Sequence, residues 1–325
     1  MVTLGSLLRR VGEDPSLAEA IGAGTGTLAV VDAARAVAVA ALAASRPGAV
    51  TLVCVAMTRD VEDLVNDLGV FLGPENVLNF PAWETLPFER VSPSPQTAGR
   101  RAEVLWRLTG RQEMPGGPLV IVGAVRSLVQ RLGPLEAASI EPVILRQGEM
   151  VDMDRLLERV VAMGYRREYQ VEHPGEVAVR GGIVDIYPST ARSPIRMELF
   201  GDELERLREI DPGDQRSTGD LAEVYIFPSR ELPTTKHTME RGRQLIETEP
   251  WGREHWQKFA DGQLFDGMES WMPWFVDDEL LLCDLLDDES QVLVLEPGRA
   301  RERVNSLVEE ERDLAAVLAR GGTEG

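Results

Sequence analysis

The chain has 325 residues, 43% of them hydrophobic, and a formal net charge of −20 at pH 7. That hydrophobic content supports a buried core and excludes a disordered tail, and the length fits two domains or one large α/β unit. A chain this acidic does not attract a phosphate backbone through its overall field, so any contact of this segment with nucleic acid must be local.

Targeting signals and membrane spans are not expected. No apolar run reaches the ~20 residues that a membrane-spanning helix needs. Met1–Arg10 contains two arginines but no apolar run follows them, so no secretory signal is recognised. A cytoplasmic protein that does not interact with membranes is therefore expected.

Two cysteines, Cys54 and Cys283, lie inside apolar runs and are expected to be buried strand residues. A disulfide is not expected in the cytoplasm. The histidines, His173, His237 and His255, are scattered far along the sequence from both cysteines, so no zinc site is predicted.

Residues 1 to about 130 alternate strand-like and helix-like runs, which predicts a doubly wound α/β domain. An acidic residue, Asp32, is expected to cap the first helix after the first strand. The expected strands are Thr27–Val31, Val50–Val55, Val77–Phe80 and Leu119–Val122, and the expected helices are Asp32–Ala44, Asp60–Phe71 and Thr97–Leu108.

The pattern changes near Ile140 to that of an α+β insert, with a helix at Asp152–Met163, three strands and a further hairpin at Glu203–Ile210. A strand at Val224–Phe227 is expected to return to the first architecture. Two further strand candidates follow at Leu280–Cys283 and Gln291–Leu295. The predicted domain ranges are 1–135, 136–222 and 223–325.

The most distinctive stretch is Gly175–Pro188, which is typical of a strand, a glycine break and a second strand. Val177 and Val179 are expected to face a core while Arg180 faces solvent. The two glycines that follow Arg180 permit a turn or bulge. The run Ile195–Phe200 alternates in the same way, so a half-exposed antiparallel sheet with arginines on its polar face is predicted, and such a surface favours binding over catalysis.

Two separate parts of the chain carry a specific resemblance. One comprises Gly175-Glu-x-x-x-Arg-Gly-Gly-Ile-x-Asp-Ile-Tyr-Pro188 with Arg196-x-Glu-x-Phe-Gly-Asp-Glu203 and Asp214-Gln-Arg-Ser217, and the other is Phe80-Pro-Ala-Trp-Glu-Thr-Leu-Pro87. Together they resemble the N-terminal region of bacterial transcription-repair coupling factors, which is similar to the repair protein UvrB. The resemblance covers nearly the whole chain. It implies a degenerate helicase-like (P-loop-type) parallel-sheet domain in two chain segments, with an inserted α+β domain that binds UvrA.

The phosphate loop of a helicase-like fold is missing. That loop needs Gly-x-x-x-x-Gly-Lys-Ser/Thr after a strand, whereas Gly22–Thr27 lacks the lysine and precedes the expected strand. The corresponding slot, Asp32, Ala33, Ala34 and Arg35, would place a carboxylate where a phosphate should lie. No cofactor and no ATP hydrolysis are therefore predicted for this chain. The resemblance agrees, because the family's UvrB-like module lacks the loop, and ATP and Mg belong to its motor domains.

Other side-chain groups favour structural roles. The carboxylates Asp185, Asp202, Glu203 and Asp214 lie in or near strands and turns, where such groups usually accept backbone N–H bonds, so no catalytic residue is predicted. The tryptophans at 251, 256, 271 and 274 lie in an acidic context, which favours a packing cluster over base stacking.

The resemblance also implies the partner-binding residues. UvrB binds UvrA through arginines in a Tyr-x-Arg context and around an Arg-Gly turn, and one further UvrB arginine is replaced here by Ala178. Arginine suits such contacts because its guanidinium meets carboxylates with two hydrogen bonds. The expected partner-binding residues are Arg166, Arg167, Arg180, Tyr187 and Arg196.

The expected function is therefore that of a protein-interaction module that binds UvrA in transcription-coupled nucleotide excision repair. The resemblance implies that RNA polymerase and double-stranded DNA are bound by domains outside this chain. The alternative is a UvrB-like, ATP-dependent DNA-damage-binding protein, which the missing lysine disfavours. A nucleotide-dependent rise in stability would distinguish the two functions.

Overall fold

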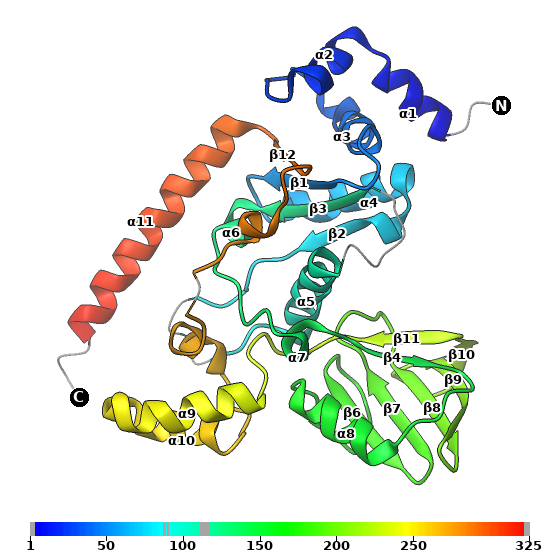
Figure 1. Cartoon of the computed structure of the whole chain (residues 1–325), viewed down its shortest axis with the longest axis vertical. Coiled ribbons are helices and arrows are strands. Elements are labelled where there is room, and N and C mark those ends of the chain that lie inside the picture. The colour runs from blue at the N-terminus through cyan, green and yellow to red at the C-terminus, as the bar shows by residue number, and fades with distance from the viewer. Residues whose placement is uncertain (1–3, 87–88, 90, 111–117, 278, 322–325) are drawn as a thin grey trace. The chain divides into compact units, whose positions relative to one another are not determined.

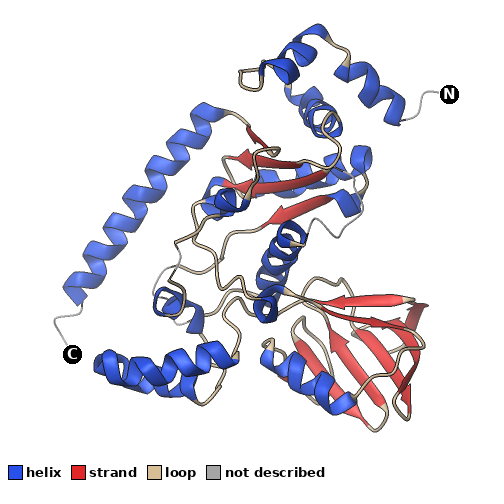
Figure 2. Cartoon of the chain, viewed as in Figure 1, coloured by secondary structure: helices blue, strands red, loops and turns tan. Residues whose placement is uncertain are grey.

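The structure is a computed structural model that describes all residues except 1–3, 87–88, 90, 111–117, 278 and 322–325. It is a mixed α/β structure with a parallel sheet, a mostly antiparallel sheet and an antiparallel pair of strands (Figures 1 and 2). The chain divides into two compact units. The first unit comprises residues 1–82, 110–131 and 280–325, and the second comprises 83–109 and 132–279. The three domain ranges expected from the sequence stay a prediction.

The first unit contains a four-stranded parallel sheet, in the order β12 (Gln291–Val294), β1 (Val50–Val55), β3 (Leu119–Ala124) and β2 (Val77–Phe80). The two central strands are buried along nearly their whole length because a parallel sheet is covered on both faces. Helix α4 (Arg59–Leu72) presents a buried stripe of Val61, Leu64 and Leu68 to the same core. These strands and this helix confirm the periodicities read from the sequence.

The remaining helices of the first unit follow in chain order. They are α1 (Leu4–Gly12), α2 (Pro15–Ala23), the 3-10 helix η1 (Asp32–Ala34), α3 (Arg35–Ala44), the 3-10 helix η2 (Pro74–Asn76), α6 (Val125–Leu128), the 3-10 helix η6 (Leu282–Leu285) and α11 (Pro297–Gly321).

Two expected strands of the first unit are wrong. Residues 27–31 form a loop outside the sheet, and Val31 is 73% exposed. Apolar side chains alone therefore do not make this segment a strand, because it has no neighbouring strand to pair with. Asp32 does not cap a helix, because α3 follows the 3-10 helix η1 and begins after Ala34. At 280–283, the Asp284 carboxylate accepts the N–H of Leu281 and stabilises a 3-10 turn instead of a strand.

This turn also corrects the expected burial of the cysteines. Cys283 is exposed, whereas Cys54 is partly buried in β1. Burial raises the pKa of the Cys54 thiol.

The second unit contains a six-stranded sheet in the order β10 (Ser217–Asp220), β9 (Glu203–Ile210), β8 (Ile195–Phe200), β7 (Ile183–Tyr187), β6 (Glu176–Arg180) and β5 (Arg166–Arg167). All neighbours are antiparallel except β5 and β6. Glu203–Ile210 is thus one strand of a hairpin with β8 and not a hairpin by itself. Gly181, at φ +61°, forms the predicted turn between β6 and β7.

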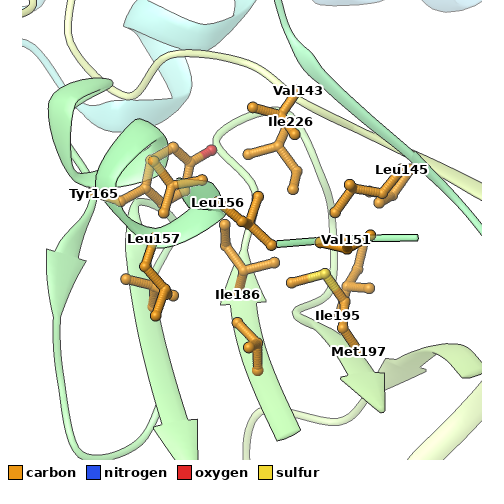
Figure 3. Close-up of a cluster of buried hydrophobic side chains, with 14 of the residues drawn as sticks. Val143, Leu145, Val151, Leu156, Leu157, Tyr165, Ile186, Ile195, Met197 and Ile226 are labelled. Atoms are coloured by element: carbon orange, nitrogen blue, oxygen red, sulfur yellow. The ribbon is translucent and has the colours of Figure 1, made fainter. Parts of the chain in front are cut away.

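One face of this sheet packs against helix α8 (Met153–Ala162), whose N-cap Asp152 accepts the N–H of Arg155. The core between them includes Leu156, Val177 and Ile186, and Figure 3 shows helix and strand side chains meeting there. This face is called the inner face below. The opposite one is called the outer face.

A two-stranded antiparallel sheet, β4 (Val143–Arg146) with β11 (Glu223–Ile226), adds to the same core. The expectation that residues 224–227 return to the first architecture is therefore wrong. The chain rejoins the parallel sheet only at β12. A strand of four residues has no sequence feature that identifies its partner strand, so the tertiary contacts determine which strand β11 pairs with.

The other helices of the second unit are α5 (Pro95–Thr109), α7 (Ala137–Ile140), α9 (Lys236–Thr248), η4 (Pro250–Gly252), α10 (Arg253–Ala260) and η5 (Met268–Trp274). Trp256, Trp271 and Trp274 belong to a hydrophobic cluster in which Trp256 is fully buried, which confirms the packing role for these three. Trp251 is 60% exposed. Of the helices described, none has the length and apolar character to cross a membrane.

Candidate functional site

The outer face of the six-stranded sheet carries a row of charged side chains across three strands. Asp185 of β7 is in register with Arg196 of β8, and Arg196 with Arg208 of β9. Because side chains alternate between the faces of a strand, these residues all lie opposite the inner core. The hairpin registers therefore gather polar residues that are up to 23 positions apart in the sequence.

The centre of this row is a buried carboxylate that holds two arginines. The Asp185 side chain is fully buried. Arg196 donates from Nε to Oδ1 and from Nη2 to Oδ2, both at 2.7 Å, and Arg180 donates from Nη2 to Oδ2 at 2.6 Å. The hydrogen bonds to Asp185 raise the pKa of Arg196. Two cations share one anion, so the cluster keeps a net charge of +1.

Arg180 is the more accessible of the two arginines, with 42% of its side chain exposed against 18% for Arg196. It ends β6 directly before the Gly181–Gly182 turn. A Cβ on Gly182 would lie 2.8 Å from the backbone oxygen of Leu199, so this tight turn requires glycine. The turn and Asp185 together fix the Arg180 guanidinium at the solvent surface.

The neighbouring arginines of the edge strand β5 lie on opposite faces. Arg166 is in register with Glu176 on the outer face and forms an ion pair with it at 3.8 Å. Arg167 is in register with Val177, a residue of the inner core, so it projects to the other side at the sheet edge. Both side chains are exposed because the strand has no further neighbour in the sheet. The structure thus brings Arg166, Arg180 and Arg196 to one face and sets Arg167 apart.

Tyr187 lies on the outer face, half-buried, and donates from its hydroxyl to the backbone oxygen of Arg192 at 2.9 Å. Its ring packs with Val171, Ala178 and Ile210 in a small apolar cluster, and burial raises the pKa of its hydroxyl. Ala178, where the resemblance indicates an arginine in UvrB, is 2% exposed within this cluster. Tyr187 therefore has a structural role in the outer face, through its packing and its hydrogen bond to the backbone.

Two residues of this region were missed by the reading of the sequence. Asp185 was predicted only as one of several carboxylates with a structural role, yet the register of the β6–β7–β8 strands would have placed it between Arg180 and Arg196. The second residue is Tyr169, an aromatic residue that is 85% exposed and lies two positions after Arg167 of β5 in the sequence. No periodicity marks it, because it lies in a loop.

The predicted phosphate slot contains an ion-pair chain. Arg35 donates from Nη2 to Asp32 Oδ1 at 2.7 Å and to Glu296 Oε1 at 3.2 Å. Two carboxylates therefore lie beside the start of α3. Phosphate would meet two negative charges there, and the loop before η1 offers no lysine. Within the described part of the chain, no three His, Cys, Asp or Glu side chains are grouped so as to hold a metal ion.

Comparison with known proteins adds independent findings. Residues 143–232 match the family model of the UvrB interaction domain. The chain is 36% identical over 301 residues, 88% of its length, to a transcription-repair-coupling factor of Mycobacterium tuberculosis, of which the match covers 24%. For the proteins of the same name in Myxococcus xanthus and Escherichia coli, the identities are 32% and 29%, each over 83% of this chain and 24% and 22% of the relative.

The chain thus spans about a quarter of the length of the curated relatives that it matches. The matched domain contains β5 to β10 and therefore the whole arginine cluster. These matches show that the chain belongs to the transcription-repair-coupling factor family, as its N-terminal region with a UvrB interaction domain.

Proposed function

We propose that the outer face of the six-stranded sheet is a docking surface for UvrA in transcription-coupled nucleotide excision repair. The observation that supports this most directly is the pair of arginines that Asp185 holds at the surface, within the segment that matches the UvrB interaction domain. An ordered guanidinium loses little conformational entropy when it meets a carboxylate of a partner, and this preorganisation favours binding.

In this proposal the face is a local cationic site on an acidic chain. The exposed cations are Arg180 and Arg166, while Arg196 holds Arg180 through the shared carboxylate. Arg167 adds a contact only if the partner reaches around the β5 edge. The net charge of −20 disfavours nucleic acid as the partner of this face, so the face is assigned to a protein with an acidic surface.

The remaining parts of the proposal concern the complete protein. The parallel sheet is a degenerate helicase-like domain in two chain segments, and the UvrA-binding domain is inserted between them. RNA polymerase, double-stranded DNA, ATP and Mg are bound by regions outside this chain. The ion-pair chain of Asp32, Arg35 and Glu296 supports a nucleotide-free module. ATP with Mg is expected to leave the thermal midpoint unchanged, and a saturable rise would favour the ATP-dependent alternative.

Binding of purified UvrA to the 325-residue chain tests the docking surface. Each charge-assisted contact is worth about 1.5–3 kcal/mol, so Arg166→Ala with Arg180→Ala is expected to weaken binding by about 100-fold or more. Arg167→Ala alone is expected to have a smaller effect, because its side chain is on the other face. Arg155→Ala, an exposed arginine of α8, serves as the matched control. Parent-like affinity of the double variant, with an intact fold by circular dichroism, would rule out this face.

A further inference from the structure

The first unit contains a small cavity at the carboxyl ends of its two central strands. Ala56 directly follows β1, and Arg126 lies in α6, directly after β3. The volume of the cavity is about 160 Å³, and its lining residues are Ala56, Met57, Thr58, Arg59, Arg126 and Arg303. The carboxyl edge of a parallel sheet is where open α/β folds bind their ligands. We infer that this cavity is a binding site for a small oxyanion, namely a phosphate or pyrophosphate group.

The lining charge is the first argument. Three arginines, from α4, α6 and α11, are among the lining residues of one cavity, and no Asp or Glu is among them. This arrangement is the reverse of the chain as a whole, with its net charge of −20. Cations that share a cavity repel one another, and an anion between them would relieve that repulsion.

The donors available are the second argument. Arg59 forms an ion pair with Asp60 at 3.6 Å, and Arg303 forms one with Glu310 at 2.6 Å. A guanidinium has five N–H donors, so one carboxylate partner leaves others for a ligand. The exposed Thr58 hydroxyl adds a neutral donor at the start of α4, whose 14 residues also direct the positive end of their dipole to this side.

The size of the cavity limits the ligand. Sites for drug-sized molecules measure about 300–1,000 Å³. At about half the lower value, this cavity has room for a phosphate or pyrophosphate group and not for a whole nucleoside triphosphate within it. The site also differs from the expected phosphate slot, because it lies at the start of α4 and not at η1 and α3. A phosphate of a nucleic-acid backbone and a free oxyanion share this chemistry.

Isothermal titration calorimetry of the whole 325-residue chain with sodium pyrophosphate and with inorganic phosphate tests the inference. One saturable site is expected, weakening as salt rises. Arg59→Gln and Arg303→Gln are each expected to lower the pyrophosphate affinity at least tenfold. Arg301→Gln is the matched control, since Arg301 is an exposed arginine of α11 that is not in the lining.

The inference is overturned if neither anion binds saturably to the parent, or if Arg301→Gln lowers the affinity as much as the other two. A folding defect is excluded by requiring circular dichroism spectra like the parent's. A 20-base-pair DNA duplex, added with bound pyrophosphate, distinguishes the sources. Displacement identifies a backbone phosphate as the ligand, and no displacement identifies a free oxyanion.

Discussion

At the residue scale, Asp185 has the largest consequence for the candidate site. Its buried carboxylate is the shared acceptor of Arg180 and Arg196, so neither guanidinium is placed by its own strand alone. Asp185→Asn keeps the shape and removes the charge. Breaking a buried ion pair from one side costs about 3–5 kcal/mol, so the free energy of unfolding is expected to fall by that order. UvrA affinity should fall as well, because Arg180 loses its fixed position.

Urea unfolding and UvrA titration measure the two effects of Asp185→Asn. The matched control is Glu198→Gln, on the same face, where the carboxylate is partly exposed and pairs with Arg208 at 3.4 Å. That change is expected to cost less than about 1 kcal/mol. If Asp185→Asn were as mild as the control, the carboxylate would not be the anchor of the arginine pair.

A second residue, Tyr165, gives the second unit a pH dependence. Its hydroxyl is buried, donates to the backbone oxygen of Phe227 at 2.8 Å and accepts the N–H of Ser189 at 3.0 Å. Burial raises the pKa of Tyr165 to about 12. The folded state thus holds this proton more tightly than the unfolded state, in which the pKa is about 10.

The stability that Tyr165 contributes through this proton is therefore complete below about pH 10 and is lost as the pH rises through 12. Two pKa units correspond to about 3 kcal/mol. Denaturant melts of the parent and of Tyr165→Phe between pH 9 and 12 measure the difference. The phenylalanine variant should show a smaller decline in this window, and equal slopes would contradict the assignment.

At the element scale, an ion pair joins helix α5 to the segment before α9. Arg101 donates from Nε and Nη2 to Glu231 at 2.8 and 3.0 Å, and both side chains are buried. The Trp83 indole donates to the same carboxylate at 2.5 Å. The Glu231 carboxylate thus binds side chains from two separate parts of the second unit. These hydrogen bonds offset the free energy that burial of an unpaired charge would cost.

Arg101→Met should leave the Glu231 charge buried without its main partner, at a cost of about 3–5 kcal/mol. Arg101→Met with Glu231→Met should recover most of that loss, since two apolar side chains of similar size remove the unpaired charge. Thermal unfolding measures both variants. Arg146→Met, whose partners Glu149 and Glu223 are solvent-exposed, should leave the midpoint unchanged. A double variant no more stable than the single one would contradict this account.

At the scale of the whole molecule, the two units have separate hydrophobic cores. Val122 lies in the core around the parallel sheet, and Ile186 lies in the core beneath α8. Chains with separate cores often depart from a single two-state transition. Differential scanning calorimetry is therefore expected to resolve two transitions.

Val122→Ala and Ile186→Ala should each lower one of these transitions and leave the other in place. Truncating a buried aliphatic side chain costs about 2–5 kcal/mol, which is enough to displace a midpoint visibly. One transition that both substitutions shift equally would show that the units unfold as a single cooperative structure.

Local pattern in the sequence predicted much of this protein. The apolar runs of β1, β2 and β3, the stripe on α4 and the alternation in β6 and β8 were read correctly, because each is a pattern within one element. The same alternation placed Arg180 on a solvent-facing strand position. The motif around the Arg-Gly turn indicated the family that the comparisons show.

Only the tertiary structure decided which segments meet. Residues 28–31 are apolar but have no sheet partner. Strand β11 pairs with β4 because the pairing energy lies in contacts between residues about 80 positions apart in the sequence. Arg166 and Arg167 are adjacent in the sequence, yet the register with β6 sends them to opposite faces. The link from Arg180 through Asp185 to Arg196 depends on three aligned strands, and a period within one strand carries no information about its neighbours.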